Sequence, residues 1–524
     1  MSEFDAILVG AGHNNLACAA HLASKGWKTA IFERNPTVGG AVRTGEYTLP
    51  GFRHDFGAMN LSLFAGSAFH RKYANELKLH GLELVPAVDC FASAFPDGRW
   101  FGVSTDLEMT VARMAGFSKA DAETWRRFVA AFPAEAAHLF ALLGLPMTGR
   151  ALAGFAWNAW RKKGATGLLD MARLLLASPR EWLDANFESA HVKATLATWG
   201  MHLDFAPDIA GGALFPYLES MVDQSFGLVI GKGGADTMIR ALEKMMAAAG
   251  GEIFTRAEVA EITTAGGKAT GVRLASGETH TATRAVIAGV APSALPGKLL
   301  PKGSGDPAFD TAMKKFRHAP GTMMIHLALD DLPDWRAGRE LRQFAYVHLA
   351  PSLDAMAQVY QQAIAGLLPA EPVLVVGQPT AIDPSRAPAG KHVLWVQVRV
   401  LPAEIKADAA GEIAPEHWDQ VKERYADRAL RILEGYAPGL NSKILGRAVF
   451  SPIDLERDNP NLVGGDQICG SHHMTQHFLF RPARGFARGN TPVEKLHLCG
   501  AAVWPGAGVG AGSGFMLAQQ LGGR

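Results

Sequence analysis

Two short apolar runs near the start of the chain flank a segment with helical periodicity. Residues 6–9 are Ala-Ile-Leu-Val, an unbroken apolar run that predicts a buried parallel strand. A glycine-rich turn follows, and residues 16–25 then place small apolar side chains on one helical face, with Gly26 as the predicted C-terminal cap. Residues 29–32 repeat the strand pattern. The order of strand, turn, helix and strand predicts a parallel βαβ unit.

The next part of the chain changes from strand-like to helical patterning. Residues 90–95 and 100–103 flank a Pro-Asp-Gly-Arg turn and predict a hairpin. From residue 107 to about residue 221, apolar residues recur mainly at the spacing of a helix. We therefore expect a hairpin of a sheet followed by a helical subdomain.

The second half of the chain returns to strands. Residues 237–249 predict a helix with Asp236 as its N-cap, and short strand-like runs follow from 252 to 290. Further runs rich in valine and leucine lie between 316 and 400, and they predict another sheet. A last long helix is predicted at 418–433.

Composition then narrows the class of protein. A length of 524 residues suggests two or three domains, or one discontinuous fold. The 48% of hydrophobic residues exclude a disordered chain, and a net charge of +1 leaves no basic field, so no nucleic-acid partner is expected. The four cysteines form no C-x-x-C pair and the histidines lack ligand spacing, so we expect no metal site. Few cysteines and an N-terminus without a basic segment predict a cytoplasmic protein.

The first glycine-rich turn reads Gly10-Ala11-Gly12-His13-Asn14-Asn15. Gly10 allows a tight turn, and Gly12 lets the backbone approach a pyrophosphate at the helix N-terminus, where unpaired N–H groups favour an anion. Glu33 follows the second strand, about 20 residues later, where a carboxylate accepts hydrogen bonds from a ribose diol and repels a 2′-phosphate. These parts predict a dinucleotide site; the alternative is a structural turn that binds no phosphate.

Asn15 departs from the usual pattern, which has a third glycine at this position. That glycine serves close packing of the helix on the strand. We expect Asn15 either to push the helix outward or to point its amide toward the ligand. Asn14 is counted with it among the predicted cofactor contacts.

A second glycine pair follows Glu33. Arg34 comes directly after the acid, and Gly39-Gly40-Ala41 precede Arg43. The two glycines allow the chain to pass close to a pyrophosphate or an isoalloxazine ring, and Arg43 supplies positive charge; the alternative is a hairpin turn with a solvated arginine. With residues 51–60, this run resembles the FAD-dependent amine-oxidase/phytoene-desaturase superfamily. The likeness is greatest to its phytoene-desaturase-like branch, which includes proteins of the pyridine nucleotide-disulfide oxidoreductase domain-containing type.

The resemblance extends to two later segments. After a predicted strand at 496–499, the glycine-rich run from 500 to 514 is similar to the C-terminal FAD motif of the superfamily, whose backbone N–H groups face the flavin. By this match the role is carried by Gly500, Ala501, Gly508 and Val509. Residues 231–290 resemble a second FAD-domain segment, in which the residue matching Val259 contacts adenine through its backbone.

The resemblance implies an α/β fold. We expect a Rossmann-like FAD-binding domain built from discontinuous segments, together with a mixed-sheet substrate domain and a helical subdomain. The expected segments are FAD-binding segment 1 (1–85), the substrate-domain hairpin and helical subdomain (86–225), FAD-binding segment 2 (226–300), the substrate domain (301–480) and the C-terminal FAD-binding segment (481–524).

The implied function is that of an FAD-dependent oxidoreductase. It would remove hydride from an apolar, polyene-like or other hydrophobic substrate, and so desaturate or isomerise it, with oxygen or a quinone as the external electron acceptor. Two alternatives stay open: a flavin amine or amino-acid oxidase, and an FAD-stabilised protein with a non-catalytic binding role. The sequence identifies no catalytic residue. Weak candidates for substrate contacts are His202, Tyr217, His473, Gln476 and Trp504.

The predicted helical subdomain has one segment in which tryptophans lie beside basic residues. From 150 to 184 there are six Lys/Arg against three Asp/Glu, and Trp157 and Trp160 lie among them. Helices on a membrane surface have this composition. A peripheral membrane contact and an ordinary helical subdomain with a solvated basic edge are both compatible with it. The longest apolar stretch, 128–147, contains Pro, Glu and His and is a poor transmembrane candidate.

Overall fold

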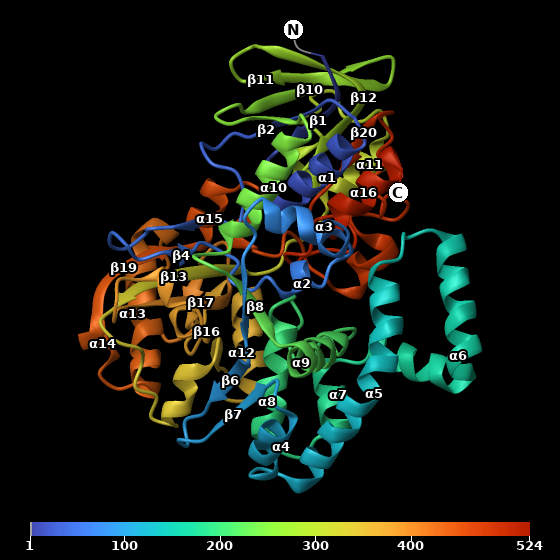
Figure 1. Ribbon diagram of the computed structural model, residues 1–524. Coiled ribbons are helices and arrows are strands. Elements are labelled where there is room, and N and C mark those ends of the chain that lie inside the picture. Colours follow the sequence, from blue (N-terminus) through green and yellow to red (C-terminus); the bar gives the residue numbers. More distant parts are fainter. Residues whose placement is uncertain (1–2, 524) are drawn as a thin grey trace.

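The computed structural model describes residues 3–523 and contains two seven-stranded sheets, one at the top of Figure 1 and one at its lower left. The first sheet has the order β10-β11-β12-β1-β2-β9, and β20 pairs with β12. Its central pairs are parallel, whereas β10, β11 and β12 form an antiparallel meander. The bounds are β1 (Glu3–Val9), β2 (Thr29–Phe32), β9 (Glu252–Phe254), β10 (Val259–Ala265), β11 (Lys268–Leu274), β12 (Thr279–Ala288) and β20 (Leu496–Leu498).

Three helices from distant parts of the chain cover one face of the first sheet. They are α1 (His13–Ser24), α10 (Asp236–Ala248) and α16 (Gly512–Gly522). All three contribute to one apolar cluster, in which the alanines of α1 allow α10 and α16 to approach closely. The predicted βαβ unit is therefore confirmed as β1-α1-β2, and both ends of the chain meet in it.

The second sheet has the order β19-β13-β17-β16-β14-β6-β7 and is mainly antiparallel. The hairpin predicted near residues 90–103 forms its β6-β7 edge, and β14 joins β6 in parallel. The long helix α13 (Trp418–Tyr436) packs on this sheet. The strand bounds are β6 (Asp89–Ala94), β7 (Trp100–Ser104), β13 (Gly321–Leu329), β14 (Tyr346–Leu349), β16 (Val373–Gly377), β17 (His392–Leu401) and β19 (Ile444–Phe450).

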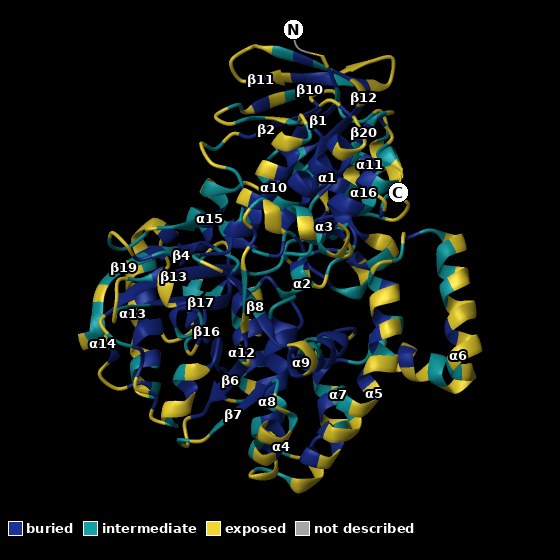
Figure 2. Ribbon diagram, viewed as in Figure 1, coloured by how far each residue is buried: buried dark blue, intermediate teal, exposed yellow. Residues whose placement is uncertain are grey.

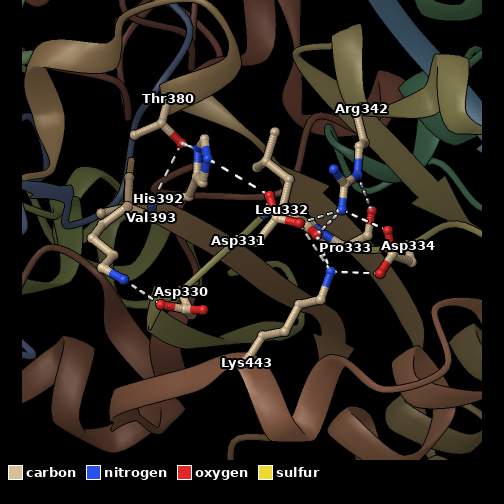
Figure 3. A network of polar contacts seen from close by, with 11 residues as sticks. Asp330, Asp331, Leu332, Pro333, Asp334, Arg342, Thr380, His392, Val393 and Lys443 are labelled. Carbon is tan, nitrogen blue, oxygen red and sulfur yellow. Dashed lines mark hydrogen bonds and ion pairs between the residues drawn. The ribbon is translucent and has the colours of Figure 1, made fainter. Parts of the chain in front are cut away.

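A network of ion pairs fixes the loop that follows β13 (Figure 3). Arg342 donates to Asp331 at 2.8 Å and to Asp334 at 2.6 Å. Lys443, which precedes β19, contacts the same two carboxylates. Hydrogen bonds from Arg342 and Lys443 outweigh the effect of burial and lower the pKa of Asp331 to about 2. Because these carboxylates are about half exposed, the network orders a surface loop and adds little to global stability.

The helical region lies at the lower right of Figure 1, and its members differ in burial (Figure 2). Helices α8 and α9 lie in the interior, whereas α6 has only two buried residues, Ala159 and Met171. No helix within residues 3–523 combines the length and hydropathy needed to cross a bilayer. The bounds are α4 (Leu107–Ala115), α5 (Lys119–Leu143), α6 (Gly149–Leu176), α7 (Pro179–Asn186), α8 (Ala190–Met201) and α9 (Leu214–Phe226).

The start of α10 differs from the sequence prediction. Asp236 is not the N-cap: the helix begins at Asp236, after Ala235, which provides no side-chain cap. The first N–H groups of the helix instead donate to side chains from a distant segment, namely Ala235 N to Asp55 at 2.7 Å and Asp236 N to Thr44 at 3.2 Å. The local pattern predicted the helix correctly, but its cap comes from tertiary structure.

Candidate functional site

The three glycine-rich turns meet at the N-terminus of α1. Gly12 is the N-cap residue of this helix, and Gly39 N donates to the carbonyl of the neighbouring Ala11 at 2.9 Å. A Cβ on Gly40 would lie 3.4 Å from Gly12 Cα, and a Cβ on Gly514 would overlap the backbone carbonyl of Asn14. The predicted segments are thus brought together by contacts that need the absence of side chains.

The N-terminus of α1 fits a bound pyrophosphate. Among the described residues, none caps α1 with a side chain, and its first turn contains no acid. Gly12 has ordinary extended dihedrals (φ −70°, ψ 159°), and nothing lies within 4 Å of where its Cβ would be. Gly10, by contrast, needs its φ of +89° for the turn. Free N–H groups, the positive helix end and open space above Gly12 are what a phosphate group requires.

Glu33 lies at the end of β2 beside the same turn, with its carboxylate buried and bound by backbone. Its Oε2 accepts from Ala11 N at 2.7 Å and its Oε1 from Asn35 N at 2.8 Å. A carboxylate oxygen has two lone pairs, so each can accept a second hydrogen bond from a ribose hydroxyl. The backbone contacts hold the side chain in that position.

The two asparagines of the first turn have different surroundings. The amide of Asn15 donates to the carbonyls of Val9 (2.9 Å) and Gly10 (2.7 Å), so it closes the end of β1. The prediction that Asn15 points its amide at a ligand is therefore wrong, because both amide protons are bound by backbone carbonyls. The side chain of Asn15 fits against Gly289, where a Cβ would overlap it. Asn14 lies against α16, with its Oδ1 3.4 Å from Gly514 N.

The second glycine-rich turn follows Glu33 in the chain and runs from Arg34 to Arg43. Arg34 is exposed, and Ala41 is half-buried, with its carbonyl where a Cβ on Gly57 would lie. Arg43 forms an ion pair with Asp458 and lies 4.8 Å from the ring centre of Phe56. The guanidinium of Arg43 is thus held by a carboxylate from the other half of the chain.

The segment around Val259 runs alongside the end of β2. Arg256 N donates to Asn35 O at 3.1 Å, and Ala257 N donates to Glu33 O at 2.8 Å. Val259 opens β10, is buried, and pairs with Leu274. The structure therefore places Val259 two residues beyond a direct backbone contact with Glu33.

The C-terminal turn closes the site from the opposite side. Gly500 follows β20 with a φ of +109°, and the space around its Cβ position is open. Its N–H donates to Ser513 Oγ at 3.0 Å, which ties the turn to α16. Gly508 also has a left-handed φ, of +106°, and its backbone is hydrogen-bonded to His13, while burial lowers the pKa of that histidine to about 4. Ala501 accepts two hydrogen bonds from Arg481, and Val509 packs at the edge of the α1–α16 cluster.

This geometry is matched by a known family. The family model for flavin-containing amine oxidoreductases matches residues 16–506. The chain belongs to this family. It is a flavin-dependent oxidoreductase with FAD as its cofactor, and the turns around α1 fit that cofactor.

Several proteins of this family resemble the chain over nearly their full length. Pyridine nucleotide-disulfide oxidoreductase domain-containing protein 2 of Rattus norvegicus is 29% identical over 98% of this chain and 92% of its own. A neurosporene-forming phytoene desaturase of Rhodobacter capsulatus is 26% identical over 98% and 93%. The crystal structure of an oxidoreductase from Methanosarcina mazei superposes with a TM-score of 0.63, at 18% identity and 98% and 99% coverage. The phytoene-desaturase-like resemblance and the α/β fold are thus confirmed.

Three of the weak substrate candidates have structural partners. Tyr217 is buried in α9, with the rings of Phe128 and Trp182 both 5.8 Å away. Gln476 forms two hydrogen bonds with the backbone of Arg317. Its Oε1 accepts from Arg317 N and its Nε2 donates to Arg317 O, both at 2.8 Å. Trp504 donates to Leu145 O at 2.9 Å. These contacts account for the burial of all three side chains.

The two histidine candidates lie in polar surroundings. His202 lies 3.3 Å from His348, and its carbonyl accepts from the buried Arg399 at 2.9 Å. His473 contacts Asp204, with Nε2 2.7 Å from the backbone oxygen and 3.2 Å from the carboxylate. Because a carbonyl can only accept, Nε2 of His473 carries a proton.

Several buried polar residues of this region carry no signal in the sequence. Asp204 has a left-handed φ of +71° and accepts from Tyr360 Oη at 2.8 Å. Burial raises the pKa of Asp204 above its usual value. Arg481 is fully buried beneath the C-terminal turn. No sequence pattern marks these residues, because their partners lie far away in the chain and their burial is set by tertiary packing.

Proposed function

We propose that the protein uses FAD to remove hydride from an apolar substrate, which it desaturates or isomerises. The observation that carries this proposal is the continuity of the flavin site with a large apolar cluster. Phe56 and Met59 follow the second glycine turn in sequence and belong to the same buried cluster as Trp199, Met221 and Trp395. A phytoene desaturase is among the relatives with full-length similarity.

The roles of the chain's own residues follow from the site. When bound, FAD supplies a hydride acceptor at its isoalloxazine ring. The N-terminus of α1 binds the pyrophosphate, Glu33 binds the ribose, and the turn from Gly500 to Val509 orients the ring. The aromatic and methionine side chains of the cluster exclude water and bind hydrocarbon by contact area. We infer that oxygen or a quinone takes the electrons away.

An anaerobic titration tests the proposal. The purified protein must release FAD on denaturation, and Gly12→Glu must abolish its visible flavin absorption. Phytoene in detergent micelles is then mixed with the holoenzyme without oxygen. We expect loss of the flavin band and formation of a desaturated or isomerised polyene. A flavin that phytoene leaves oxidised, while another class of compound reduces it, would rule out a polyene substrate.

One observation favours an amine as a second candidate substrate. Glu219 and Asp223 lie at i and i+4 on α9, and Asp223 Oδ2 is buried without a hydrogen-bond partner within residues 3–523. Burial raises the pKa of Glu219 to about 7, and burial and the charge of Glu219 raise that of Asp223 well above its usual value. A bound ammonium group would favour the ionised form of Asp223 and donate a hydrogen bond to its unpaired oxygen. Dodecylamine should then reduce the flavin of the wild type but not that of Asp223→Asn. Reduction by phytoene in both the wild type and the variant would exclude an amine as the substrate.

The third hypothesis, an FAD-stabilised binding protein, is addressed by the same titration. If neither phytoene nor dodecylamine reduces the flavin, but FAD raises the melting temperature, a non-catalytic role is favoured. The fold alone does not decide among these functions.

We also propose that α6 rests on a membrane surface. Trp157 and Trp160 are 60% and 46% exposed, their rings are 5.0 Å apart, and Arg161 and Lys162 are exposed beside them. Indole rings and basic side chains together suit an anionic bilayer surface. Binding to phosphatidylglycerol-containing vesicles should fall roughly tenfold in the double variant Trp157→Ser/Trp160→Ser. The control Leu79→Ser changes an exposed residue of α3 (Ala68–Leu79) and should bind normally; equal binding by all three proteins would refute this contact.

A further inference from the structure

Arg481 is a fully buried arginine whose hydrogen bonds all go to backbone carbonyls. Its Nη1 donates to Ser471 at 2.8 Å, and its Nη2 donates to Cys469 and Gly470 at 3.2 Å. Both Nε and Nη2 also donate to Ala501, at 3.0 and 2.8 Å. Every acceptor is neutral, although a buried guanidinium is usually paired with a carboxylate.

Of the residues that the structure describes, no carboxylate is in direct contact with Arg481. In the described part of the chain, no carboxylate lies within ion-pair distance of it. Asp466 acts on Arg481 through its charge, and backbone hydrogen bonds from Ile468 N at 2.9 Å and Ala319 N at 3.0 Å hold its carboxylate in place. Burial lowers the pKa of Arg481 to about 10, so it stays protonated at neutral pH.

The histidines beside Arg481 do not share its charge. Burial lowers the pKa of His472 well below its usual value and that of His477 to about 3, and Arg481 adds to both effects. Both imidazoles are therefore neutral near pH 7. Cys469 is also protonated, because burial raises the pKa of its thiol to about 12. The site thus keeps the positive charge of Arg481 in a buried region, while Asp466, the acid that acts on it, is not in ion-pair contact with it.

The C-terminal turn lies directly on this charge. A Cβ on Gly506 would be 3.3 Å from Arg481 Nε, and Ala507 N donates to His472 Nε2 at 2.9 Å. The carbonyl of Ala501 accepts two of the guanidinium's hydrogen bonds, which polarises the peptide that links it to Ala502 and strengthens that peptide's N–H as a donor. Arg481 therefore acts on whatever the turn binds, without touching it.

We propose that Arg481 is a positioning residue that raises the reduction potential of the bound flavin. The inference rests on the proposed function, in which the turn from Gly500 to Val509 faces the flavin ring. Reduction places negative charge on that ring, and a fixed positive charge in a medium of low dielectric favours the reduced form. Arg481 would thus make the flavin a stronger hydride acceptor, as abstraction from an unactivated C–H bond requires.

The test compares the reduction potentials of FAD-loaded variants by anaerobic equilibration with indicator dyes. In Arg481→Met the ratio of reduced to oxidised flavin at a fixed potential should fall about tenfold, equivalent to ~30 mV for a two-electron couple. Arg481→Lys keeps the charge and should stay within about threefold of the wild type. Arg317→Met removes an exposed arginine from a neighbouring segment and should leave the potential unchanged, because solvent screens that charge.

A measurement on the unmodified protein covers the case in which Arg481→Met does not fold. The proposal requires the wild type to bind reduced FAD more tightly than oxidised FAD, so the bound potential must exceed that of free FAD. A bound potential at or below the free value overturns it, as does an unchanged potential in Arg481→Met with FAD bound. A wild-type protein that binds no FAD would instead overturn the proposed function itself.

Discussion

The variant Gly12→Ala should weaken FAD binding without destabilising the cofactor-free protein. Gly12 has dihedrals that alanine adopts without strain, and nothing lies within 4 Å of the added methyl group. A Gly→Ala change at such a position stabilises a protein by about 0.4–1 kcal/mol, because it restricts the unfolded chain. The cofactor-free variant should therefore unfold at an equal or slightly higher urea concentration than the wild type.

The same methyl group occupies the space that a pyrophosphate needs at the start of α1. Overpacking a close contact costs about 1–3 kcal/mol, which weakens FAD binding roughly 5- to 150-fold. At a concentration 100 times the wild-type Kd, FAD stabilises the wild type by about 2.7 kcal/mol. A 100-fold weaker Kd reduces this to about 0.4 kcal/mol. Most of the FAD-dependent rise in Tm should thus disappear.

Isothermal titration with FAD and thermal unfolding with and without FAD check both halves of the prediction. Gly154→Ala is a matched control, because its Cβ also meets nothing within 4 Å but it lies in α6. That variant should bind FAD like the wild type. Wild-type affinity in Gly12→Ala would show that the open space above Gly12 is not the pyrophosphate site, and a loss of stability without FAD would refute the packing argument.

Three further outcomes follow from the packing and the charges. Gly514→Ala should destabilise the protein by about 1–3 kcal/mol in urea unfolding, because the new methyl group overlaps the backbone of Asn14; an unchanged midpoint would contradict the close contact between α1 and α16. Gly435→Ala, at an open position of α13, should instead raise stability by up to about 1 kcal/mol in the same assay. Burial would raise the pKa of Asp408, but hydrogen bonds from Arg428 outweigh it and hold that pKa at about 2, below the unfolded value near 4. The contribution of Asp408 to stability is therefore present above pH ~4 and is lost as the pH falls toward 2. In urea titrations, Asp408→Asn should lower the free energy of unfolding by about 3–5 kcal/mol at pH 7. Between about pH 4 and pH 2 the free energy of unfolding of this variant should fall less than that of the wild type; parallel pH profiles would contradict this.

The local parts of the fold could be predicted from the sequence, and the parts set by distant contacts could not. The strand at residues 29–32 was predicted with its observed bounds, because an apolar run flanked by turn residues leaves few alternatives. The first helix was predicted from Leu16 but begins at His13, since its cap is a glycine without a side-chain signal. The role of Asn15 depends on Gly289, far along the chain, so its spacing within the motif could not show it.

The candidate site divides in the same way. Its glycines were identified because turns, close approach and helix starts impose residue types at fixed spacing. Arg481, Asp204 and Tyr360 carry no such spacing, and only the folded chain buries them together with their partners. The identity of the substrate depends on that second group, which explains why the cofactor is established while the substrate is a proposal.

The first sheet combines strands that are synthesised at very different times. The turn at Gly12 leaves the ribosome long before β20 and the turn at Gly500 are translated. At about 5–20 residues per second, roughly 25–100 s separate the two. During that interval β12 lacks β20, its neighbour on one side, and the helices of the first sheet lack α16. Such long-range closure slows folding, so the nascent chain must keep an unfinished nucleotide fold from aggregating until β20 and α16 have been synthesised.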